Sequence, residues 1–431
     1  MSTLKAVRGT RDLLPPETAL WNRIEATARA VFARYNFGEI RTPIFEDTGL
    51  FSRGVGEETD IVSKEMYTWE DKARAQSEKS QSLTLRPENT AGVVRAYIEH
   101  KLGETGQLQK LYYIGPQFRR ERPQKGRYRQ FSQIGAEVIG PTSAGSESPL
   151  RDAEVLEMLA TLLNELGITG WTLNLNSVGS AADRAKYNET LRAALAPVIG
   201  QMCQDCQRRA VTNPLRVLDC KVPEDQPIIE TLPVIADSLD EESKKHFAAV
   251  TAALDAAGVP YTRNHRLVRG LDYYTRTTFE FTHGGLGAQN ALLGGGRYDG
   301  LSELIGGPKA PGIGFAIGED RLVLTLLAQE SAASQVLADA FIAPLGESLN
   351  PAALALAKQL RQAGLRIELG EGSFRLKKSF EAADKTARKI VILGEDELQS
   401  GILTVKDFAT GNQNKVPRAE LAAFLYHSGS N

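Results

Sequence analysis

Apolar positions recur at helical spacing in two long segments of the first half of the chain. Residues 17–35 carry one such stripe and end before Gly38, and residues 150–166 carry another and end before Gly167. A stripe with a period near 3.6 residues is typical of a helix that packs one face on a core, and glycine commonly follows the last turn. The pattern predicts two amphipathic helices.

Short alternating patterns predict strands between these helices. Residues 38–47 (GEIRTPIFED) form one pattern, and Pro43 assigns it to a sheet edge or a bulge because proline lacks the backbone donor. Residues 71–82 are polar and aperiodic, which indicates a solvated loop. The following segment, SLTLRPENT, reads as an extended strand with one polar face. That face consists of Thr84, Arg86 and Glu88.

Two longer strand patterns follow at residues 108–121 and 129–140, separated by a short basic loop. Such a pair predicts an antiparallel hairpin. One face of the second strand is apolar and consists of Ile134, Ala136 and Val138. The opposite face carries Phe131, Gln133 and Glu137. Because successive side chains of a strand point to opposite faces, we expect these last three residues to form the floor of a polar cleft.

In the rest of the chain, the type of predicted secondary structure changes at several points. Residues 177–260 contain helical patterns with scattered prolines, which indicates an inserted helical subdomain. Sheet patterns resume in residues 261–330, where GGGRYDGL is expected to be a glycine-rich turn before a final strand and helix. From residue 336 onward strands and helices alternate, which indicates a separate α/β domain.

The composition predicts a folded, water-soluble protein of several domains. At ~150 residues per domain, 431 residues suggest about three domains. The 51 basic and 53 acidic residues leave a formal charge of -2, so RNA binding would need local patches. No secretion signal opens the chain and no run of ~20 apolar residues occurs, so we expect a cytoplasmic location without membrane attachment.

The chain has three cysteines, Cys203, Cys206 and Cys220. They are too few to stabilise a chain of this length by disulfide bonds, which favours a reducing compartment. They offer three thiolates to zinc, but a closed structural site needs four ligands and the sequence reveals no fourth. We therefore expect three free thiols and no structural metal.

The predicted hairpin is rich in cations in and beside its loop. They are Arg119, Arg120, Arg122, Lys125, Arg127 and Arg129. Guanidinium groups bind phosphate oxygens through paired hydrogen bonds, so this density suits a phosphate-bearing ligand. An isolated basic run is more often a solvated loop. The neighbouring Gln133 and Glu137 favour the ligand site.

Other candidate residues lie farther along the chain. The motif RGLDYY brings Arg269 beside Tyr273 and Tyr274, which suits a pocket for a small polar ligand, although a tyrosine pair packed on a sheet would look the same. Arg321 stands at the start of a predicted helix, where backbone N–H groups favour an anion. The chain lacks GxxxxGK[ST], GxGxxG and HExxH, so a bound nucleotide would use another design and a zinc hydrolase is not supported.

Six motifs together resemble the bacterial histidyl-tRNA synthetase family of class II aminoacyl-tRNA synthetases. They follow the expected order along the whole chain: RGTRDLLPPE, LTLRPENT, FRRERPQKGRYRQFSQIGAE, LVRGLDYYTR, GGGRYDGL and GIGFAIGEDRL. The resemblance implies an α+β fold with an antiparallel six-stranded catalytic sheet flanked by helices. Residues 1–176 and 261–330 would form the catalytic domain, residues 177–260 a helical insertion, and residues 336–431 an α/β anticodon-binding domain.

The resemblance also implies an activity, namely a histidine–tRNA ligase. Such an enzyme converts histidine and ATP to histidyl-adenylate and pyrophosphate, and then passes the histidyl group to the 3′ end of histidine tRNA. ATP would be a substrate, and Mg²⁺ would be bound mainly through ATP rather than by a protein metal site. A second copy of the chain would complete a homodimer through the first long helix and the Pro43 strand.

Site residues follow from the same resemblance. ATP would be bound by Arg119, Phe131 and Arg321, with Arg119 and Arg269 as the catalytic pair across the α-phosphate. Histidine would be bound by Glu88, Thr90, Gln133, Glu137, Arg269, Tyr273, Tyr274 and Tyr298. Gln124 would meet the tRNA acceptor end. Candidates for anticodon-stem phosphates are Arg375, Lys377, Lys378, Lys385, Arg388 and Lys389.

Two other functions compete with this hypothesis. A non-catalytic paralogue, similar to the regulatory subunit of ATP phosphoribosyltransferase, would keep the fold but bind histidine as a signal. The terminal α/β domain and the full set of arginines disfavour it. A general RNA-binding protein could use the basic loop alone, but the near-zero net charge argues against it.

Overall fold

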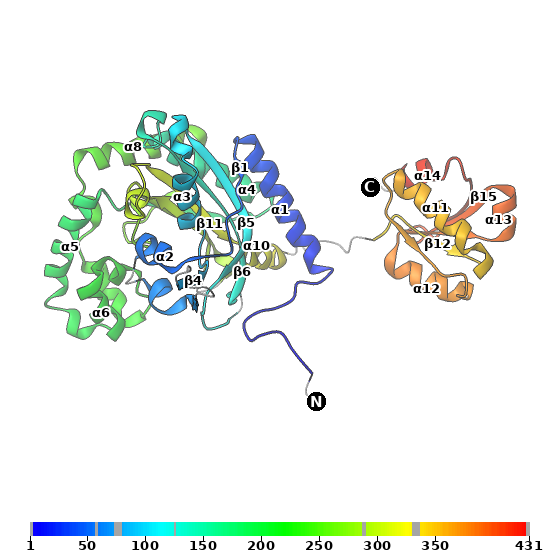
Figure 1. Cartoon of the computed structure of the whole chain (residues 1–431), viewed down its shortest axis with the longest axis horizontal. Coiled ribbons are helices and arrows are strands. Elements are labelled where there is room, and N and C mark those ends of the chain that lie inside the picture. Colours follow the sequence, from blue (N-terminus) through cyan, green and yellow to red (C-terminus); the bar gives the residue numbers. More distant parts are fainter. Residues whose placement is uncertain are drawn as a thin grey trace. The chain divides into compact units, whose positions relative to one another are not determined.

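The structure is a computed structural model that describes residues 3–56, 59–72, 80–124, 126–286, 290–329 and 337–427. The chain divides into two compact units, residues 1–332 and residues 333–431 (Figure 1). Among the described helices, none combines the length and the apolar composition that crossing a bilayer requires.

An eight-stranded sheet forms the centre of the first unit. Its spatial order is β1 (Gly38–Glu39), β5 (Gln109–Phe118), β6 (Gln130–Ile139), β11 (Gly312–Gly318), β10 (Ala291–Arg297), β9 (Thr275–His283), β7 (Trp171–Ser177) and β8 (Thr262–Arg263). The six inner strands are antiparallel, and the two-residue edge strands β1 and β8 pair in parallel. The predicted six-stranded antiparallel sheet is confirmed, with two short additions at its edges.

Four helices of this unit pack on one another and on the sheet. They are α1 (Glu17–Arg34), α4 (Pro149–Glu165), α8 (Glu241–Ala257) and α10 (Glu319–Ala328). Helix α1 buries its whole apolar stripe, and α4 begins at Ser148, whose hydroxyl accepts a hydrogen bond from a backbone N–H of the first turn. Gly167 follows α4 with a positive φ, as expected for a helix stop. Both long amphipathic helices are therefore confirmed.

A small second sheet corrects two predictions for residues 38–90. It consists of β2 (Phe45–Asp47), β4 (Gln81–Leu85) and β3 (Tyr67–Asp71), with helices α2 (Thr48–Val55), η1 (Ile61–Glu65) and α3 (Thr90–Glu99) beside it. Pro43 lies between β1 and β2, which belong to different sheets, so the single edge strand was wrong.

The polar strand face was also wrong, because β4 ends at Leu85. Pro87 has no backbone donor and cannot extend the ladder. Glu88 consequently lies in the turn that leads into α3 rather than on a strand. Of the predicted loop at residues 71–82, residues 73–79 lie outside the described part of the chain.

The segment after β7 is helical, and most of it packs around its own core. Its elements are α5 (Ala181–Leu195), η4 (Ile199–Gln201), α6 (Gln204–Thr212), η5 (Pro214–Asp219), η6 (Pro223–Asp225), α7 (Gln226–Thr231) and η7 (Ile235–Ser238). The buried residues of this core include Tyr187, Leu191, Cys206 and Val217. Helix α8 packs instead against α4.

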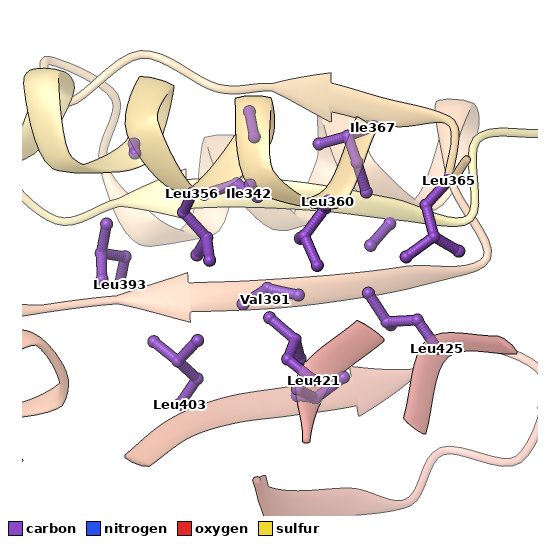
Figure 2. Close-up of a cluster of buried hydrophobic side chains, with 14 of the residues drawn as sticks. Ile342, Leu356, Leu360, Leu365, Ile367, Val391, Leu393, Leu403, Leu421 and Leu425 are labelled. Carbon is purple, nitrogen blue, oxygen red and sulfur yellow. The ribbon is translucent and has the colours of Figure 1, made fainter. Parts of the chain in front are cut away.

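The second unit alternates strands and helices, as predicted. Its five-stranded sheet has the order β13 (Ile367–Leu369), β12 (Ala340–Pro344), β14 (Lys389–Leu393), β15 (Ile402–Asp407) and β16 (Gln413–Pro417). The helices are α11 (Asn350–Gln362), α12 (Leu376–Thr386), α13 (Glu395–Ser400) and α14 (Leu421–His427). Leucines of α11 and α14 meet the strands around Val391 in one apolar core (Figure 2).

The remaining short helices are η2 (Leu102–Thr105), η3 (Thr142–Ala144), η8 (Gly284–Leu286), α9 (Leu301–Leu304) and η9 (Glu347–Leu349).

Candidate active site

Two adjoining cavities lie on the large sheet. The small cavity has a volume of about 160 Å³ and is lined by residues that include Glu88, Thr90, Tyr273, Tyr274 and Tyr298. The large cavity has a volume of about 400 Å³ and is lined by residues that include Glu121, Arg127, Phe131, Glu280 and Arg321. Both cavities share Arg119, Gln133 and Arg269 in their walls.

A buried carboxylate lies beneath the small cavity. Glu137 on β6 accepts a hydrogen bond from the Thr90 hydroxyl at 2.7 Å and another from the Tyr298 hydroxyl at 2.7 Å. Burial raises the pKa of Glu137 to about 8, although both hydroxyl donors oppose this shift. The carboxyl is therefore held in one orientation and poised to change its charge near neutral pH.

Close backbone approach makes room for this carboxylate. Gly314 on β11 pairs with Glu137 across the sheet, and a Cβ atom at Gly314 would lie 1.7 Å from the Glu137 Oε2 atom. Any larger residue would displace the carboxylate, so glycine is required at this position.

Glu88 lies at the start of α3. Its carboxylate accepts hydrogen bonds from the backbone N–H groups of Thr90 at 2.7 Å and Ala91 at 3.0 Å. Burial raises its pKa, while these two donors act in the opposite direction. Each oxygen keeps a lone pair for a further donor in the small cavity.

Tyrosines form one wall of the small cavity. The ring centroids of Tyr273 and Tyr274 are 4.7 Å apart, and those of Tyr273 and Tyr298 are 5.9 Å apart. Tyr113 on β5 also lines this cavity and was missed in the sequence, where it looks like any aromatic residue of a strand. The wall combines apolar rings with hydroxyl groups, which suits a ligand with a polar ring.

The predicted hairpin of β5 and β6 positions Arg119 and Phe131. The Arg119 Nε–H group donates to the Pro87 carbonyl at 2.9 Å, and its guanidinium carbon lies 5.3 Å from the centroid of the Phe131 ring. The arginine is thus fixed by the turn that precedes α3, with its remaining donors available at the junction of the two cavities.

Arg269 lies at the same junction. Its Nη1 group donates to Glu280 on β9 at 2.6 Å, while its buried Nε atom has no hydrogen-bond partner in the described chain. Burial disfavours the charged form, but the Glu280 carboxylate outweighs this effect and the pKa of Arg269 is raised. Arg269 therefore stays cationic at the junction and retains an unused donor.

The glycines of GGGRYDGL correct another prediction, because they belong to β10 rather than to a turn. A Cβ atom at Gly294 would lie 2.3 Å from the Arg269 Nη2 atom, and one at Gly296 would lie 2.8 Å from the Tyr274 ring. These glycines allow two cavity side chains to rest directly on the strand, a need that local sequence does not reveal.

Arg321 lies in the first turn of α10, as predicted, and faces the large cavity. Its Nη1 group donates to the Ala291 carbonyl at 2.5 Å. Burial lowers its pKa, and the nearby Arg127 adds to this effect. Two cations at short range favour an anion between them.

The two predicted glutamines differ in position. Gln133 is buried in the shared wall, and its Oε1 atom has no hydrogen-bond partner among the described residues. Gln124 lies at the tip of the hairpin, where its backbone pairs with Arg127, and it does not line either cavity.

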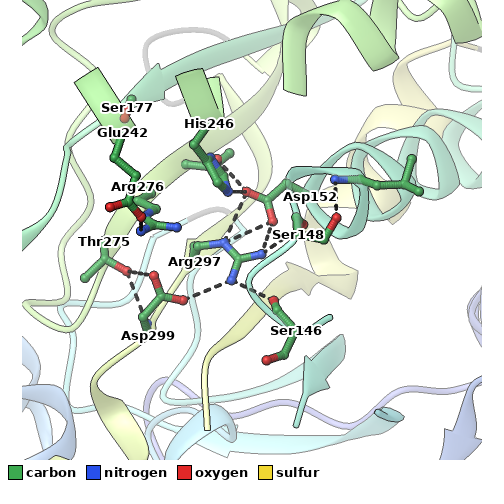
Figure 3. Close-up of polar contacts among 12 residues, drawn as sticks. Ser146, Ser148, Asp152, Ser177, Glu242, His246, Thr275, Arg276, Arg297 and Asp299 are labelled. Carbon is green, nitrogen blue, oxygen red and sulfur yellow. Dashed lines mark hydrogen bonds and ion pairs between the residues drawn. The ribbon is translucent and has the colours of Figure 1, made fainter. Parts of the chain in front are cut away.

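A buried ion network holds the end of β10 next to Tyr298 (Figure 3). The Arg297 guanidinium is fully buried and donates to Asp152 at 3.1 Å, to the Ser146 carbonyl at 2.8 Å and to Asp299 at 2.9 Å. No local pattern in the sequence predicts this arrangement, because its members come from distant segments. It fixes the backbone that presents Tyr298 to Glu137.

This arrangement has a clear chemical capacity. Arg119, Arg269 and Arg321 converge on the large cavity, where they can offset the charge of an anionic ligand such as a polyphosphate. The small cavity offers carboxylates, an amide and phenols to a small polar molecule. Two reactants held in these cavities would meet beside Arg119 and Arg269.

Known proteins resemble the chain along its whole length. Residues 9–322 match the family described as Histidyl-tRNA synthetase, and residues 339–427 match the family described as Anticodon binding domain. The histidine–tRNA ligase of Koribacter versatilis (strain Ellin345) is 72% identical over 428 residues, which cover 99% of this chain and 97% of that protein. That of Solibacter usitatus (strain Ellin6076) is 57% identical over 424 residues, which cover 98% and 99%.

A comparison with solved structures points to the same family. The apo histidyl-tRNA synthetase of S. aureus superposes with a TM-score of 0.80 at 39% sequence identity, covering 98% of this chain and 100% of that chain. Sequence similarity and fold thus agree over both units.

Proposed function

The chain belongs to the histidyl-tRNA synthetase family, and we propose that its two adjoining cavities are where histidine and ATP react. The enzyme is a histidine–tRNA ligase: it forms histidyl-adenylate and pyrophosphate from histidine and ATP, and transfers the histidyl group to the 3′ end of histidine tRNA. The observation that carries the proposal is the shared wall, because Arg119, Gln133 and Arg269 line both cavities.

ATP occupies the large cavity in this proposal. Arg119 and Arg269 hold the α-phosphate at the junction, and Arg321 holds the γ-phosphate from the start of α10. Phe131 stacks under the adenine. The separation of the three guanidinium groups over one cavity supports this assignment, since a triphosphate needs several cations along its length.

Histidine occupies the small cavity. Glu88, Thr90 and Gln133 bind the ammonium group, for which the unpaired Gln133 oxygen and the spare lone pairs of Glu88 supply acceptors. Glu137 and Tyr274 bind the two imidazole nitrogens. Tyr273 and Tyr298 enclose the imidazole ring, and the hydrogen bond from the Tyr298 hydroxyl holds the Glu137 side chain in a fixed orientation.

The reaction joins two anions, because the histidine carboxylate attacks the α-phosphorus while negative charge grows on the phosphate oxygens. Fixed guanidinium groups offset that repulsion, and an arginine placed on a transferring phosphate contributes ~10³-fold or more in rate. Arg119 is fixed by the Pro87 carbonyl and Arg269 by Glu280, so neither has to reorganise during the step.

Mg²⁺ is the expected companion of ATP, and carboxylates line the large cavity. Mg²⁺ favours oxygen ligands and usually takes one or two carboxylates together with phosphates. Glu121 and Glu280 line the large cavity but pair with Arg127 at 2.9 Å and Arg269 at 2.6 Å, so the phosphates of ATP would supply most of the ligands of the ion, which supplies positive charge near the leaving pyrophosphate.

Selectivity for histidine follows from the proposed small cavity. A site built to hydrogen-bond polar atoms of its ligand rejects analogues without them by ~10⁴ to 10⁵. Glu137 keeps its hydrogen bonds from Thr90 and Tyr298 with any ligand, but an apolar side chain would form no hydrogen bond with Glu137 or Tyr274, and this loss opposes its binding.

For tRNA recognition, we assign the acceptor end to the hairpin tip with Gln124 and the anticodon stem to the second unit. The match of residues 339–427 to an anticodon-binding family supports the latter. Lys389 is not available for the predicted contact with tRNA phosphates, because its side chain is buried and paired with Asp407 at 3.1 Å. We retain the expected division into a catalytic domain of residues 1–176 and 261–330, a helical insertion of residues 177–260 and an anticodon-binding domain of residues 336–431.

We further propose a homodimer in the cytoplasm. Ile44, Phe45 and Trp69 on the small sheet are exposed, and the Phe45 and Trp69 rings lie 6.1 Å apart. This exposed apolar patch suits a second copy of the chain. Helix α1 directs its apolar stripe into its own subunit, which leaves the small sheet as the better candidate. Sedimentation velocity tests the dimer, and Phe45→Asp should yield monomers whereas Leu304→Asp should not.

ATP–pyrophosphate exchange with each amino acid supplied separately tests the assignment of the cavities. Exchange should require histidine and the full set of three arginines. Exchange with several amino acids at equal rates would contradict the proposed small cavity. A histidine-binding regulatory paralogue would show no exchange at all.

A further inference from the structure

Three cysteines and an aspartate lie together in the helical segment, away from both cavities. Cys203 precedes α6, Cys206 lies in its first turn, Cys220 follows η5, and Asp225 lies in η6. The three sulfur atoms and a carboxylate oxygen of Asp225 all lie within 4.8 Å of one another. The fourth ligand that the sequence did not reveal is therefore adjacent in space.

We propose that these four residues bind one Zn²⁺ ion in a structural site. The Sγ atoms of Cys203 and Cys220 are 3.9 Å apart, and the Asp225 Oδ2 atom is 3.2 Å from the Cys220 Sγ atom. Around zinc with bonds of ~2.3 Å to sulfur, tetrahedral geometry places two sulfurs ~3.8 Å apart. A disulfide would require a separation of ~2.05 Å. The distance between the two sulfurs therefore excludes a disulfide and fits a tetrahedral ligand set, while in the absence of the ion the Cys220 thiol donates a hydrogen bond to Asp225.

Backbone donors orient the thiols in the same way. The Cys206 N–H group points at the Cys203 Sγ atom at 3.4 Å, and the Val222 N–H group points at the Cys220 Sγ atom at 3.4 Å. Donors of this kind stabilise thiolates and fix the direction of metal ligands. Two of the three sulfurs are thus held in place before any ion binds.

Asp225 supplies the strongest argument for a cation. Its side chain is buried, and its oxygens accept hydrogen bonds from the Cys203 N–H group at 3.1 and 3.3 Å. Within the described ranges, no lysine, arginine or histidine forms an ion pair with it. The Cys220 thiol also donates to this carboxylate at 3.2 Å, so hydrogen bonds alone hold the buried negative charge, and a metal ion would neutralise it.

The ligand types select zinc over other ions. Mg²⁺ and Ca²⁺ take oxygen ligands, whereas three thiolates with one carboxylate match the sulfur and oxygen ligands that zinc accepts in four-coordinate sites. The ion would be closed off by protein ligands, as a structural site requires.

The ion would stabilise a segment that reaches the large cavity. Between Cys206 and Cys220 lies η5, whose Arg216 lines that cavity and pairs with Asp60 at 3.1 Å. Asn213, just before η5, donates to Asp272 at 2.8 Å. A metal ion bound at both Cys206 and Cys220 would tie the two ends of this stretch together, so zinc would help to fix the position of Arg216.

Metal content of the full-length protein tests the proposal directly. Protein produced with zinc under reducing conditions should retain about one zinc ion per chain after gel filtration. Asp225→Asn keeps the side-chain shape but removes the charge, and should weaken zinc binding by roughly tenfold or more, as should Cys203→Ser. The matched control is Asp205→Asn, which changes an exposed carboxylate of α6 outside the ligand set and should leave the zinc content unchanged.

A second measurement does not depend on how well the variants fold. Co²⁺ added to the metal-free wild-type protein should produce thiolate-to-metal charge-transfer absorption and the intense visible bands of a tetrahedral site. The proposal would be overturned if wild-type protein retained no zinc and if added zinc did not protect its three thiols from a thiol reagent. A disulfide between Cys203 and Cys220 that persists in protein purified under reducing conditions would also overturn the proposal. So would equal zinc content in wild type, Asp225→Asn and Cys203→Ser.

Discussion

Arg297 and Asp152 form an ion pair in which both side chains are completely buried (Figure 3). The two residues are 145 positions apart, and their contact ties the start of α4 to the end of β10. The Thr277 hydroxyl donates to the same carboxylate at 2.6 Å. Because both side chains are shielded from water, removal of one charge leaves the other in a low-dielectric interior.

Arg297→Met should therefore lower the free energy of unfolding of the first unit by about 3–5 kcal/mol. The double variant Arg297→Met with Asp152→Leu should recover much of this loss, because it removes both charges. Urea unfolding followed by tryptophan fluorescence measures both effects. Arg208→Ala, which breaks an exposed pair with Asp205, should cost no more than about 1 kcal/mol. Equal stability of the single and double variants would show that the charge of Asp152 is not the cause.

The carboxyl of Glu137 should make stability depend on pH. Its pKa is raised to about 8, mainly by burial, whereas in the unfolded chain the carboxyl titrates near its ordinary pKa of 4.5. Between these two values the folded protein holds a proton that the unfolded chain has released, so stability falls as pH rises through this window. Glu137→Gln cannot ionise. Wild type should therefore lose thermal stability relative to this variant as pH rises from 5 toward 8.

Comparison of the two proteins isolates Glu137 from other groups. Burial also raises the pKa of Glu319 to about 8, but that residue is present in both proteins and its effect cancels in the difference. The measurement is the midpoint of thermal unfolding at several pH values without ligand. A difference in midpoint that does not vary with pH would contradict the prediction.

Arg269→Ala should slow ATP–pyrophosphate exchange by roughly 10²-fold or more, because it removes a fixed donor from the proposed α-phosphate site. Arg266→Ala is the matched control, since Arg266 is more exposed and pairs with Glu230 at 3.5 Å outside both cavities. Circular dichroism should report the same fold for both variants. A wild-type exchange rate in Arg269→Ala would refute the role of this residue.

Gly314→Ala should raise the KM for histidine more than the KM for ATP. The new Cβ atom would overlap the Glu137 carboxylate, which lies beneath the small cavity. Overpacking of this kind also destabilises a protein by about 1–3 kcal/mol. Gly300→Ala, where a Cβ atom would meet no other atom within 4 Å, should change neither constant. Equal increases in both KM values would point to general damage of the sheet.

Removal of residues 333–431 should largely spare ATP–pyrophosphate exchange but reduce charging of histidine tRNA at limiting tRNA. Residues 1–332 form a compact unit that contains both cavities, whereas the second unit matches an anticodon-binding family. Initial charging rates at several tRNA concentrations measure the effect. Unchanged charging at low tRNA would refute this division of labour.

Local periodicity was enough to predict the long helices and the hairpin of β5 and β6. The alternation on β6 predicted Phe131, Gln133 and Glu137 as the floor of one cleft; Phe131 and Gln133 do line the cavities, whereas Glu137 is fully buried and lines neither. These features depend on neighbours a few residues away, which the sequence shows directly.

Features made by distant segments could not be predicted in this way. The three glycines of β10 read as a turn, because nothing nearby indicates that Arg269 and Tyr274 rest on them. Asp225 was not recognised beside the cysteines for the same reason, since only the fold brings η6 to α6. Glu88 was placed on a strand because the pattern of alternation continued past Pro87, where the ladder ends.

The packing of β10 has a consequence for anyone who wishes to redesign this enzyme for a bulkier amino acid. Gly294 and Gly296 already carry the smallest side chain, and the residues above them are in direct contact with the strand. No trimming of this floor can create space. Enlargement has to begin with the tyrosines that line the cavity, Tyr274 or Tyr298, and each of these changes would also remove a hydroxyl group from the cavity.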